Sequence, residues 1–336
     1  MHPDGRRIGA HLPLGHGLVH AVERAHEIGL DSLQVFSDNP TAWRRRTEPP
    51  SELPAFRARV AELGLGPIAI HAAYLVNLAG SDPGLVEHSA TVLATELRVA
   101  PSFGARFVNV HVGSHRGTDA ASGTGRLADG VARVLGETDD GPDAAILVLE
   151  NSAGSGDVLG SRVEDLAAIL DAIAARGVPI RRVAICLDSA HLWGVGYPIS
   201  DPGEVDRLVS DVDRLVGLDR LAMIHFNDSR AALGSHADRH EHIGAGSIGP
   251  AGMAALLSHP RLRHVAYYLE TPGMDEGYDA LNAARVRDLA AGRPLTELPP
   301  EAATIGRSRS RTHPPSDVGT ADEPAIDSRG RPRKPR

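Results

Sequence analysis

The sequence predicts a TIM (β/α)8 barrel, because eight short apolar runs alternate with eight helix-like stretches along its 336 residues. The runs are apolar throughout rather than alternately polar, as expected for parallel strands that are covered on both faces. Most of them end on His, Asp or Glu, and all strand ends of a barrel meet at one face. A doubly wound open sheet is the alternative, but the number of units and the polar strand ends favour the barrel.

The first half of the chain supplies four of these units. The predicted strands cover residues 7–12, 32–36, 67–70 and 107–110, and the helices that follow them cover 17–29, 54–63, 85–100 and 125–136. The first of these helices has apolar side chains at Leu18, Ala21, Ala25 and Ile28, which share one helical face.

The second half supplies the other four units. The predicted strands cover residues 145–149, 183–187, 221–224 and 265–269, and the helices cover 163–175, 204–215, 250–257 and 282–291. The eight units together span about 290 residues, which is an ordinary length for a barrel of this kind.

Composition limits the class of protein. Apolar residues make up 42% of the chain and aromatic residues 4%, so the core must consist mainly of Ala, Val, Leu and Ile. The formal charge of −8 by itself disfavours a nucleic-acid partner, but carboxylates that bind metal ions should be discounted from this sum. The single cysteine, Cys186, excludes an internal disulfide and is predicted to be a small buried residue. We expect a cytoplasmic protein without a signal peptide or membrane span.

The composition changes near residue 299. Residues 1–298 are predicted to form the barrel domain, whereas 299–336 are rich in Pro, Ser and Arg, nearly lack apolar residues and are predicted to be disordered. Basic residues cluster near both ends of this tail, at 307–311 and 329–336. The tail is either a solubilising segment or a non-specific phosphate-binding arm.

Residues that commonly bind metal ions lie at the ends of the predicted strands and in the loops that follow. The strand ends supply His71, His111, Glu150, Asp188, His225 and Glu270, and the loops add His191, Asp238 and His240. One catalytic zinc ion takes three or four protein ligands, so nine candidates predict two or three ions with a bridging carboxylate. Thiolates, which are typical of structural zinc sites, are missing from this set, and hydrolytic metal chemistry is therefore favoured.

The spacing of two pairs supports this interpretation. Asp188 and His191 are three residues apart and share a face if they lie on a helical turn. Asp238 and His240 are two apart and point the same way in an extended loop.

Several stretches together resemble the endonuclease IV family, the zinc-dependent apurinic/apyrimidinic endonucleases also called AP endonuclease family 2. They are IGAH (8–11), VFSDNPTAW (35–43), IHAAYLVNLA (70–79), VNVHVGSH (108–115), LENSAGSGDVLG (149–160), ICLDSAHLWGVGY (185–197), IHFNDS (224–229), DRHEHIGAGSIG (238–249) and LETP (269–272). The resemblance covers residues 7–292 and leaves out the tail.

The resemblance implies a trinuclear zinc site, with Mn²⁺ as a substitute ion. The first zinc would be held by His71, His111 and Glu150, the second by Glu150, Asp188, His225 and Glu270, and the third by His191, Asp238 and His240. Glu150 would thus be both a bridging ligand and the central catalytic residue. The implied partner is double-stranded DNA with an abasic or 3′-blocked lesion, bound by a monomer at the nucleoid.

The implied reaction is hydrolysis of the phosphodiester 5′ to an abasic site during base excision repair. It leaves a 3′-hydroxyl and a 5′-deoxyribose phosphate, and family members also remove 3′-blocking groups. The abasic nucleotide must leave the helix to reach the metal ions, and the missing base makes this easier.

The resemblance also implies DNA contacts. Residues Tyr74 and Leu75 match the family residues that fill the gap left by the extruded nucleotide, and Asn39, Arg44 and Arg45 lie in a second DNA-facing loop. The chain departs from the family in two places. Thr41 replaces a common arginine, and Ala72-Ala73 replaces a common Asp-Ser pair, which removes a carboxylate that would orient a ligand.

Two other functions remain as alternatives. A sugar isomerase or epimerase on the same type of barrel also has metal ions at the strand ends, but it needs fewer of them and does not need His71, His111, Asp238 and His240. A DNA-binding damage sensor with weak catalysis is supported only by the departures at Thr41 and Ala72.

Overall fold

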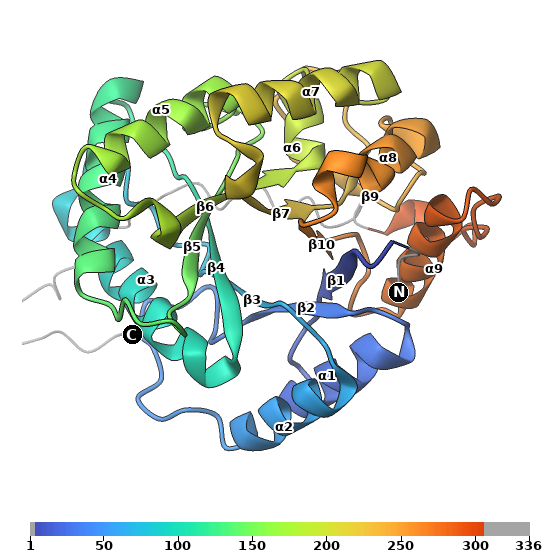
Figure 1. Cartoon of the computed structure of the whole chain (residues 1–336), viewed down its shortest axis with the longest axis horizontal. Helices are drawn as coiled ribbons and strands as arrows, with labels where there is room; N and C mark the ends of the chain where they lie inside the picture. Colours follow the sequence, from blue (N-terminus) through green and yellow to red (C-terminus); the bar gives the residue numbers. More distant parts are fainter. Residues whose placement is uncertain (1–3, 306–336) are drawn as a thin grey trace, which may run out of the picture. The chain divides into compact units, whose positions relative to one another are not determined.

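Eight parallel strands close into a barrel in the computed structural model, which describes residues 4–305 (Figure 1). The barrel strands are β1 (Arg7–His11), β2 (Ser32–Phe36), β3 (Ile68–His71), β4 (Ala105–His111), β5 (Ile146–Glu150), β6 (Val183–Asp188), β7 (Leu221–His225) and β10 (Ala266–Leu269). Each strand pairs with its neighbours in chain order, and β10 pairs with β1 to close the barrel. The predicted barrel is therefore confirmed, and the open-sheet alternative is excluded.

A ring of helices covers the outside of the barrel (Figure 1). After each strand comes one long helix: α1 (Leu18–Glu27), α2 (Leu53–Leu63), α3 (Pro83–Phe103), α4 (Ala120–Gly136), α5 (Val163–Ala174), α7 (Pro202–Leu215), α8 (Gly249–Ser258) and α9 (Tyr278–Ala290). Three short elements at the strand ends were not predicted: the helix α6 (Ser189–Gly194) and a two-stranded sheet of β8 (Asp228–Ser229) and β9 (His240–Glu241).

Helix starts differ most from the prediction, and in α3 and α4 a capping side chain accounts for the earlier start. Helix α4 begins at Ala120 rather than 125, since the carboxylate of Asp119 accepts a hydrogen bond from the Ser122 amide. Within this helix, position 123 is a glycine, and any larger residue would place its Cβ atom too close to the side chain of His115. Helix α3 likewise begins at Pro83, after the Asp82 cap, and not at 85.

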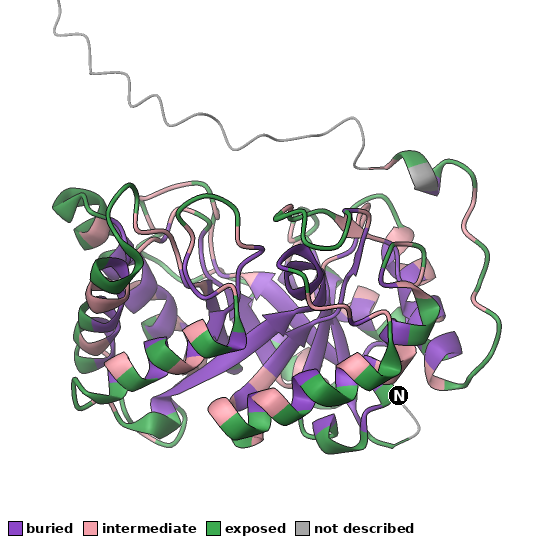
Figure 2. Ribbon diagram, turned by 90° about the horizontal axis from the view of Figure 1, so that it is seen from above, coloured by how far each residue is buried: buried purple, intermediate pink, exposed green. Residues whose placement is uncertain are grey.

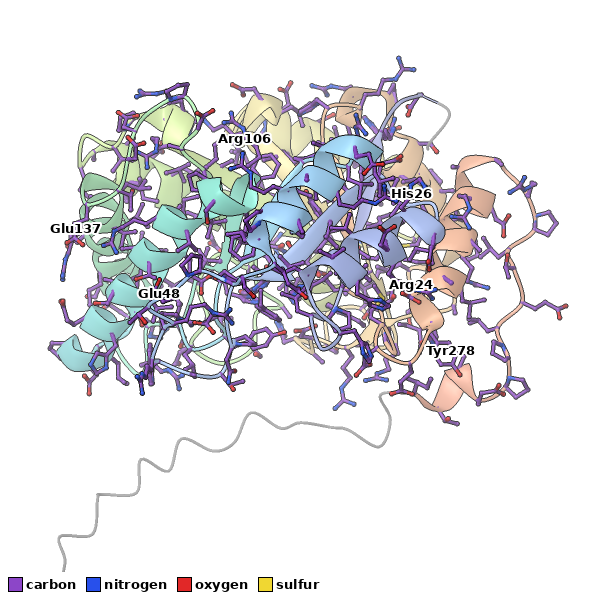
Figure 3. The ribbon with its side chains drawn as sticks, turned by 90° about the horizontal axis from the view of Figure 1, so that it is seen from below. Arg24, His26, Glu48, Arg106, Glu137 and Tyr278 are labelled. Atoms are coloured by element: carbon purple, nitrogen blue, oxygen red, sulfur yellow. The ribbon has the colours of Figure 1, made fainter. Side chains whose placement is uncertain are left out.

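The hydrophobic core has two layers. Buried side chains between the strands and the helices form the larger layer, and the inner faces of the helices are buried while their outer faces are exposed (Figure 2). Charged side chains such as Glu137 project outward from the helical ring (Figure 3). The smaller layer fills the barrel interior with Ala69, Phe107, Val148, Ala184, Cys186, Met223, Ala266 and Tyr268. Cys186 is fully buried there, as predicted.

The interior layer determines what the barrel mouth contains. Successive side chains of a strand point to opposite faces, so residues two positions apart point the same way. Two positions beyond the interior residues Ala69, Val148 and Tyr268 lie His71, Glu150 and Glu270. The same step leads from Cys186 to Asp188 and from Met223 to His225. The apolar interior therefore continues, at the carboxyl ends of the strands, into a layer of imidazoles and carboxylates.

The chain divides into two units, Met1–Leu298 and Pro299–Arg336. Residues 299–305 are the described part of the second unit and contain a short 3-10 helix, η4 (Ala302–Thr304). The prediction of a disordered basic tail concerns mainly residues 306–336, which lie outside the described residues. Among residues 4–305, no helix has the length and apolar character needed to cross a membrane.

Candidate metal centre

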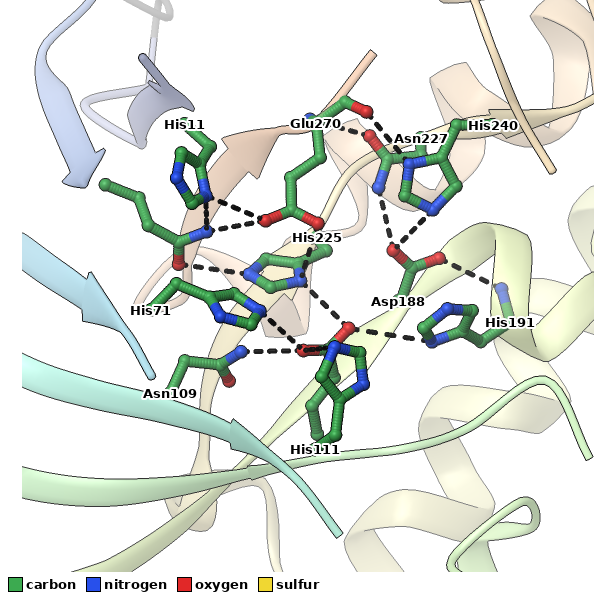
Figure 4. Close-up of polar contacts among 12 residues, drawn as sticks. His11, His71, Asn109, His111, Asp188, His191, His225, Asn227, His240 and Glu270 are labelled. Atoms are coloured by element: carbon green, nitrogen blue, oxygen red, sulfur yellow. Dashed lines mark hydrogen bonds and ion pairs between the residues drawn. The ribbon is translucent and has the colours of Figure 1, made fainter. Parts of the chain in front are cut away.

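The nine candidate ligands converge at one end of the barrel, and Figure 4 shows most of them around a shared polar centre. Within residues 4–305, three groups of side chains have ligand atoms within 4.8 Å of one another. They are His71, His111 and Glu150; Glu150, Asp188, His225 and Glu270; and Asp188, His191 and His240. Asp238 lies outside these groups but touches the third, with carboxylate oxygens 3.2 Å from His191 Nε2 and 3.1 Å from His240 Nε2.

Glu150 occupies the middle of the cluster. Its side chain is 1% exposed, and its carboxylate oxygens lie 3.0 Å from His225 Nδ1, 3.6 Å from His71 Nε2 and 4.0 Å from His111 Nε2. The Asn109 side-chain amide donates a hydrogen bond of 2.6 Å to the oxygen that faces His71 and His111. One oxygen therefore faces the first group and the other faces His225, which is the arrangement of a bridging carboxylate.

Backbone carbonyls orient most of the imidazoles. His71 Nδ1 lies 2.7 Å from the Ala72 carbonyl, His191 Nδ1 lies 2.9 Å from the Asn151 carbonyl and His240 Nδ1 lies 2.8 Å from the Glu270 carbonyl. A carbonyl only accepts, so each Nδ1 carries the proton and each Nε2 is left facing the carboxylates. Metal-ligating histidines commonly donate their second N–H in this way.

This donor set fits divalent metal ions. It contains imidazole nitrogens and carboxylate oxygens without a thiolate, which suits Zn²⁺ in an open site and also Mn²⁺. Three buried or partly buried carboxylates, Glu150, Asp188 and Glu270, lie close together and need positive charge between them.

The charges of the cluster support the same conclusion. Burial raises the pKa of the Glu150 carboxyl, but His225 and His111 outweigh this effect and hold the pKa well below its ordinary value. Burial lowers the pKa of His191, but the carboxylates of Asp188 and Asp238 raise it to about 10. The Glu150 carboxylate is therefore ionised at neutral pH, and the proton on His191 supplies positive charge that a bound cation would replace.

Local structure explains the spacing of the predicted pairs. Asp188 caps the start of α6, and its Oδ1 accepts a hydrogen bond of 2.9 Å from the His191 amide, so both side chains face the centre. The pairing of β8 with β9 sets Ser229 opposite His240 and brings the 238–249 loop over the barrel mouth. Asp228 fastens this loop by accepting hydrogen bonds from the Gly246 and Ile248 amides.

Several polar residues that support the ligands were missed by the sequence reasoning. Asn227 donates a hydrogen bond of 2.7 Å to Asp188 and accepts one of 2.8 Å from the Glu270 amide. Asn109 donates a hydrogen bond to Glu150. Gln34 contacts both His225 and Glu270. The strand-end rule overlooks Gln34 and Asn109 because they precede the last strand residue, whereas the two-residue alternation of the strands places them inside the barrel.

A cleft of about 760 Å³ opens from the metal-ligand cluster, and its lining includes His111, Glu150, Asn39 and Tyr74. The Tyr74 side chain is 59% exposed, and Leu75 is half-buried. Asn39 accepts hydrogen bonds from the Thr41 amide and hydroxyl, which shapes the loop after β2. Of the predicted DNA-facing residues, Asn39 and Tyr74 therefore line the cleft, and Leu75 and Arg45 are each adjacent in sequence to a residue that does.

Arg45 departs from the expectation that it faces the DNA. Its side chain is 8% exposed, lies 3.5 Å from the buried Glu96 of α3 and donates to the Asn39 carbonyl. The buried carboxylate draws the guanidinium inward, so Arg45 anchors the loop instead of projecting from it. The neighbouring Arg44 is exposed.

Comparison with known proteins identifies relatives over nearly the whole barrel. Residues 22–291 match the model of a family described as xylose isomerase-like TIM barrel. The protein named "Probable endonuclease 4" from Methanoculleus marisnigri is 37% identical over 84% of this chain and 98% of its own length. The crystal structure of endonuclease IV from Thermus thermophilus superposes with a TM-score of 0.73 at 35% identity, covering 85% of this chain and 99% of that one.

Sugar epimerases share the fold but are much less similar in sequence. A D-tagatose 3-epimerase-like protein superposes with a TM-score of 0.61 at 14% identity, over 85% of this chain and 97% of that one, which shows a common barrel and no more. Coverage is similar in both groups, but the identity of 35–37% is found with the endonuclease 4 relatives. The chain belongs to the endonuclease IV family.

Proposed function

We propose that this protein cuts duplex DNA on the 5′ side of an abasic site and leaves a 3′-hydroxyl and a 5′-deoxyribose phosphate. As a member of the endonuclease IV family, it is a DNA-cleaving hydrolase. The observation that carries the proposal is the position of Glu150, whose two carboxylate oxygens face different groups of ligands at the floor of an open cleft.

We propose that three zinc ions occupy the cluster and that Mn²⁺ substitutes for them. His71, His111 and Glu150 would hold the first, Glu150, Asp188, His225 and Glu270 the second, and His191, Asp238 and His240 the third. Bound divalent ions would lower the pKa of a water molecule and neutralise negative charge on the phosphate. The proximity of Asp188 to His240, 3.4 Å, links the second and third sets and supports a single centre.

The residues of the chain bind and orient the substrate in this proposal. Hydrogen bonds fix most of the ligands, among them His71, His191 and Asp188, so these need little rearrangement when a phosphate enters. Tyr74 and Leu75 fill the space that the extruded nucleotide leaves, and Tyr74 is exposed as this role requires. Asn39 and Arg44 contact the DNA backbone, while Arg45 holds their loop in place.

Two further activities follow from the same proposal. Because 3′-blocking groups are also attached through phosphodiester bonds, the centre would remove them and act as a 3′-phosphodiesterase. The basic residues at 307–311 and 329–336 would hold the enzyme near DNA through phosphate contacts, with residues 1–298 as the catalytic domain. We propose that the enzyme acts as a monomer at the nucleoid.

The test is incision of an end-labelled duplex that contains one tetrahydrofuran abasic analogue. We expect the zinc-loaded protein to cut on the 5′ side of the analogue, to leave an undamaged duplex intact, and to lose cutting in Glu150→Gln. Tight binding without cutting by the zinc-loaded protein would favour the damage-sensor alternative. If it neither binds nor cuts but epimerises a ketose such as D-tagatose, the sugar alternative replaces the proposal.

A further inference from the structure

Gln34 lies inside the barrel mouth between two proposed ligands of the second metal ion. Its side chain is fully buried on β2, and its amide nitrogen lies 2.7 Å from Glu270 Oε1 and 3.1 Å from His11 Nδ1. Its amide oxygen lies 3.1 Å from His225 Nε2. An ionised carboxylate only accepts hydrogen bonds, so the NH2 group of Gln34 must face Glu270 and its oxygen must face His225.

This orientation of the amide determines which nitrogen of His225 carries a proton. The amide oxygen of Gln34 only accepts, so His225 Nε2 is the donor. The other ring nitrogen, Nδ1, lies 3.0 Å from Glu150 Oε1 and 3.4 Å from Glu270 Oε2. His225 thus presents Nδ1, rather than Nε2, to the space between the two carboxylates.

His225 differs in this respect from three of its neighbours. In His71, His191 and His240, the partner of the outer ring nitrogen is a backbone carbonyl, which substitution does not remove. In His225 the partner is the side chain of Gln34. The same side chain also contacts Glu270, so one residue fixes two of the four ligands proposed for the second ion.

We propose that Gln34 is a positioning residue for the second metal ion. It holds His225 in the tautomer that presents Nδ1, and it fixes the carboxylate of Glu270 at the distance needed to share a cation with Glu150. This inference rests on the proposed metal centre, but it concerns zinc binding without DNA. Its failure is therefore distinguishable from failure of the proposed nuclease activity.

The first experiment measures zinc affinity of the full chain by competition with a chromogenic chelator, for the native protein, Gln34→Ala and the nearly isosteric Gln34→Met. Loss of a residue that orients a metal ligand typically weakens metal binding by about tenfold to a hundredfold. We expect a loss of this size for one of the bound ions in both variants, with the affinities of the others changed much less.

Ser32→Ala is the matched control. Ser32 precedes Gln34 on the same inward face of β2, and its hydroxyl lies 3.1 Å from the Tyr268 hydroxyl, away from the proposed ligands. We expect this variant to bind zinc like the native protein, even if its thermal stability falls. Equal zinc affinity in the native protein, Gln34→Ala and Gln34→Met would overturn the proposal, as would an equal loss in Ser32→Ala.

A second measurement does not depend on the folding of any variant. The ring nitrogens of ¹⁵N-labelled histidine in the native zinc-loaded protein report which nitrogen is protonated and which binds metal. We expect His225 to show a protonated Nε2 and a metal-bound Nδ1. A metal-bound Nε2 would contradict the role assigned to Gln34, whatever the substitutions do.

Discussion

Arg45 Nη2 lies 3.5 Å from Glu96 Oε1, and both side chains are almost completely buried beneath the loop after β2. Ser37 at the start of that loop also donates a hydrogen bond to Glu96, and so does the backbone amide of Ala73 in the loop after β3. Glu96 therefore fastens both of the loops that carry the proposed DNA contacts. The consequences are measurable in stability and in DNA binding.

Glu96 makes the stability of the protein depend on pH. Burial raises the pKa of its carboxyl from 4.5 to about 7, although Arg45 opposes the shift. The folded protein then binds more protons than the unfolded chain. The stabilisation that this proton uptake adds to the unfolding free energy is fully present below pH 4.5 and is lost as the pH rises through 7. The shift corresponds to about 3 kcal/mol at most. We expect Glu96→Gln to remove this loss of unfolding free energy between about pH 5 and 8, measured by urea denaturation.

Glu87→Gln is the control for this measurement. Glu87 lies on the same helix but is exposed, and the hydrogen bond from Arg133 lowers the pKa of its carboxyl. We expect the unfolding free energy of this variant to fall between about pH 5 and 8 as it does in the native protein. If Glu96→Gln keeps that profile as well, Glu96 is not the group responsible.

Arg44 and Arg45 are adjacent but should affect different properties. Arg44 is exposed, so Arg44→Ala should remove one phosphate contact, weaken duplex binding and reduce the slope of log K against log salt by about one. Arg45→Ala should leave Glu96 buried without its partner and lower the unfolding free energy at alkaline pH by roughly 3 kcal/mol. Fluorescence anisotropy at several salt concentrations and urea denaturation separate the two effects. An unchanged stability of Arg45→Ala would contradict the anchoring role.

Tyr74 should contribute to recognition of the lesion. Its ring is 59% exposed at the edge of the cleft, where it would stack on bases next to the extruded nucleotide. Stacking on an aromatic side chain is worth about 1–3 kcal/mol per base, so Tyr74→Ala should weaken binding of an abasic duplex by about tenfold or more. Ile180→Ala, which truncates an exposed residue just before β6 at the opposite end of the barrel, should leave binding unchanged.

The basic tail should act through salt-sensitive contacts. Removal of residues 306–336 deletes every Lys and Arg after position 298. We expect the shortened chain to bind undamaged DNA more weakly at low salt and to approach the native protein at high salt, where phosphate contacts are screened. Its incision at an abasic site under saturating conditions should not change. If the slope of log K against log salt is the same in the shortened chain as in the native protein, the tail is better explained as a solubilising segment.

The sequence was sufficient to predict the barrel because parallel strands covered on both faces are continuous apolar runs, and such runs are easy to recognise. It was also sufficient to collect His71, Glu150 and Glu270 at one mouth, because the barrel brings all strand ends together. Asp238 was placed in the cluster by its spacing from His240, and its carboxylate does lie 3.1 Å from that imidazole.

Other features depend on three-dimensional packing that a linear pattern does not contain. The inward position of Arg45 results from Glu96, a carboxylate on a helix far along the chain, and the run of arginines gives no sign of it. Gln34 and Asn109 are inside the mouth because of strand alternation, but their residue types alone do not distinguish a ligand-orienting amide from an ordinary polar residue. The short sheet of β8 and β9 was missed because its strands are too brief to form a recognisable pattern.

The central claim is that nine side chains form one three-ion centre, and counting zinc per chain tests it most directly. Native mass spectrometry of the reconstituted protein should show three zinc ions. Asp238→Ala removes a carboxylate that contacts His191 and His240 of the third set, so this variant should show two. Fewer than three ions in the native protein, or the same number in both proteins, would contradict the account.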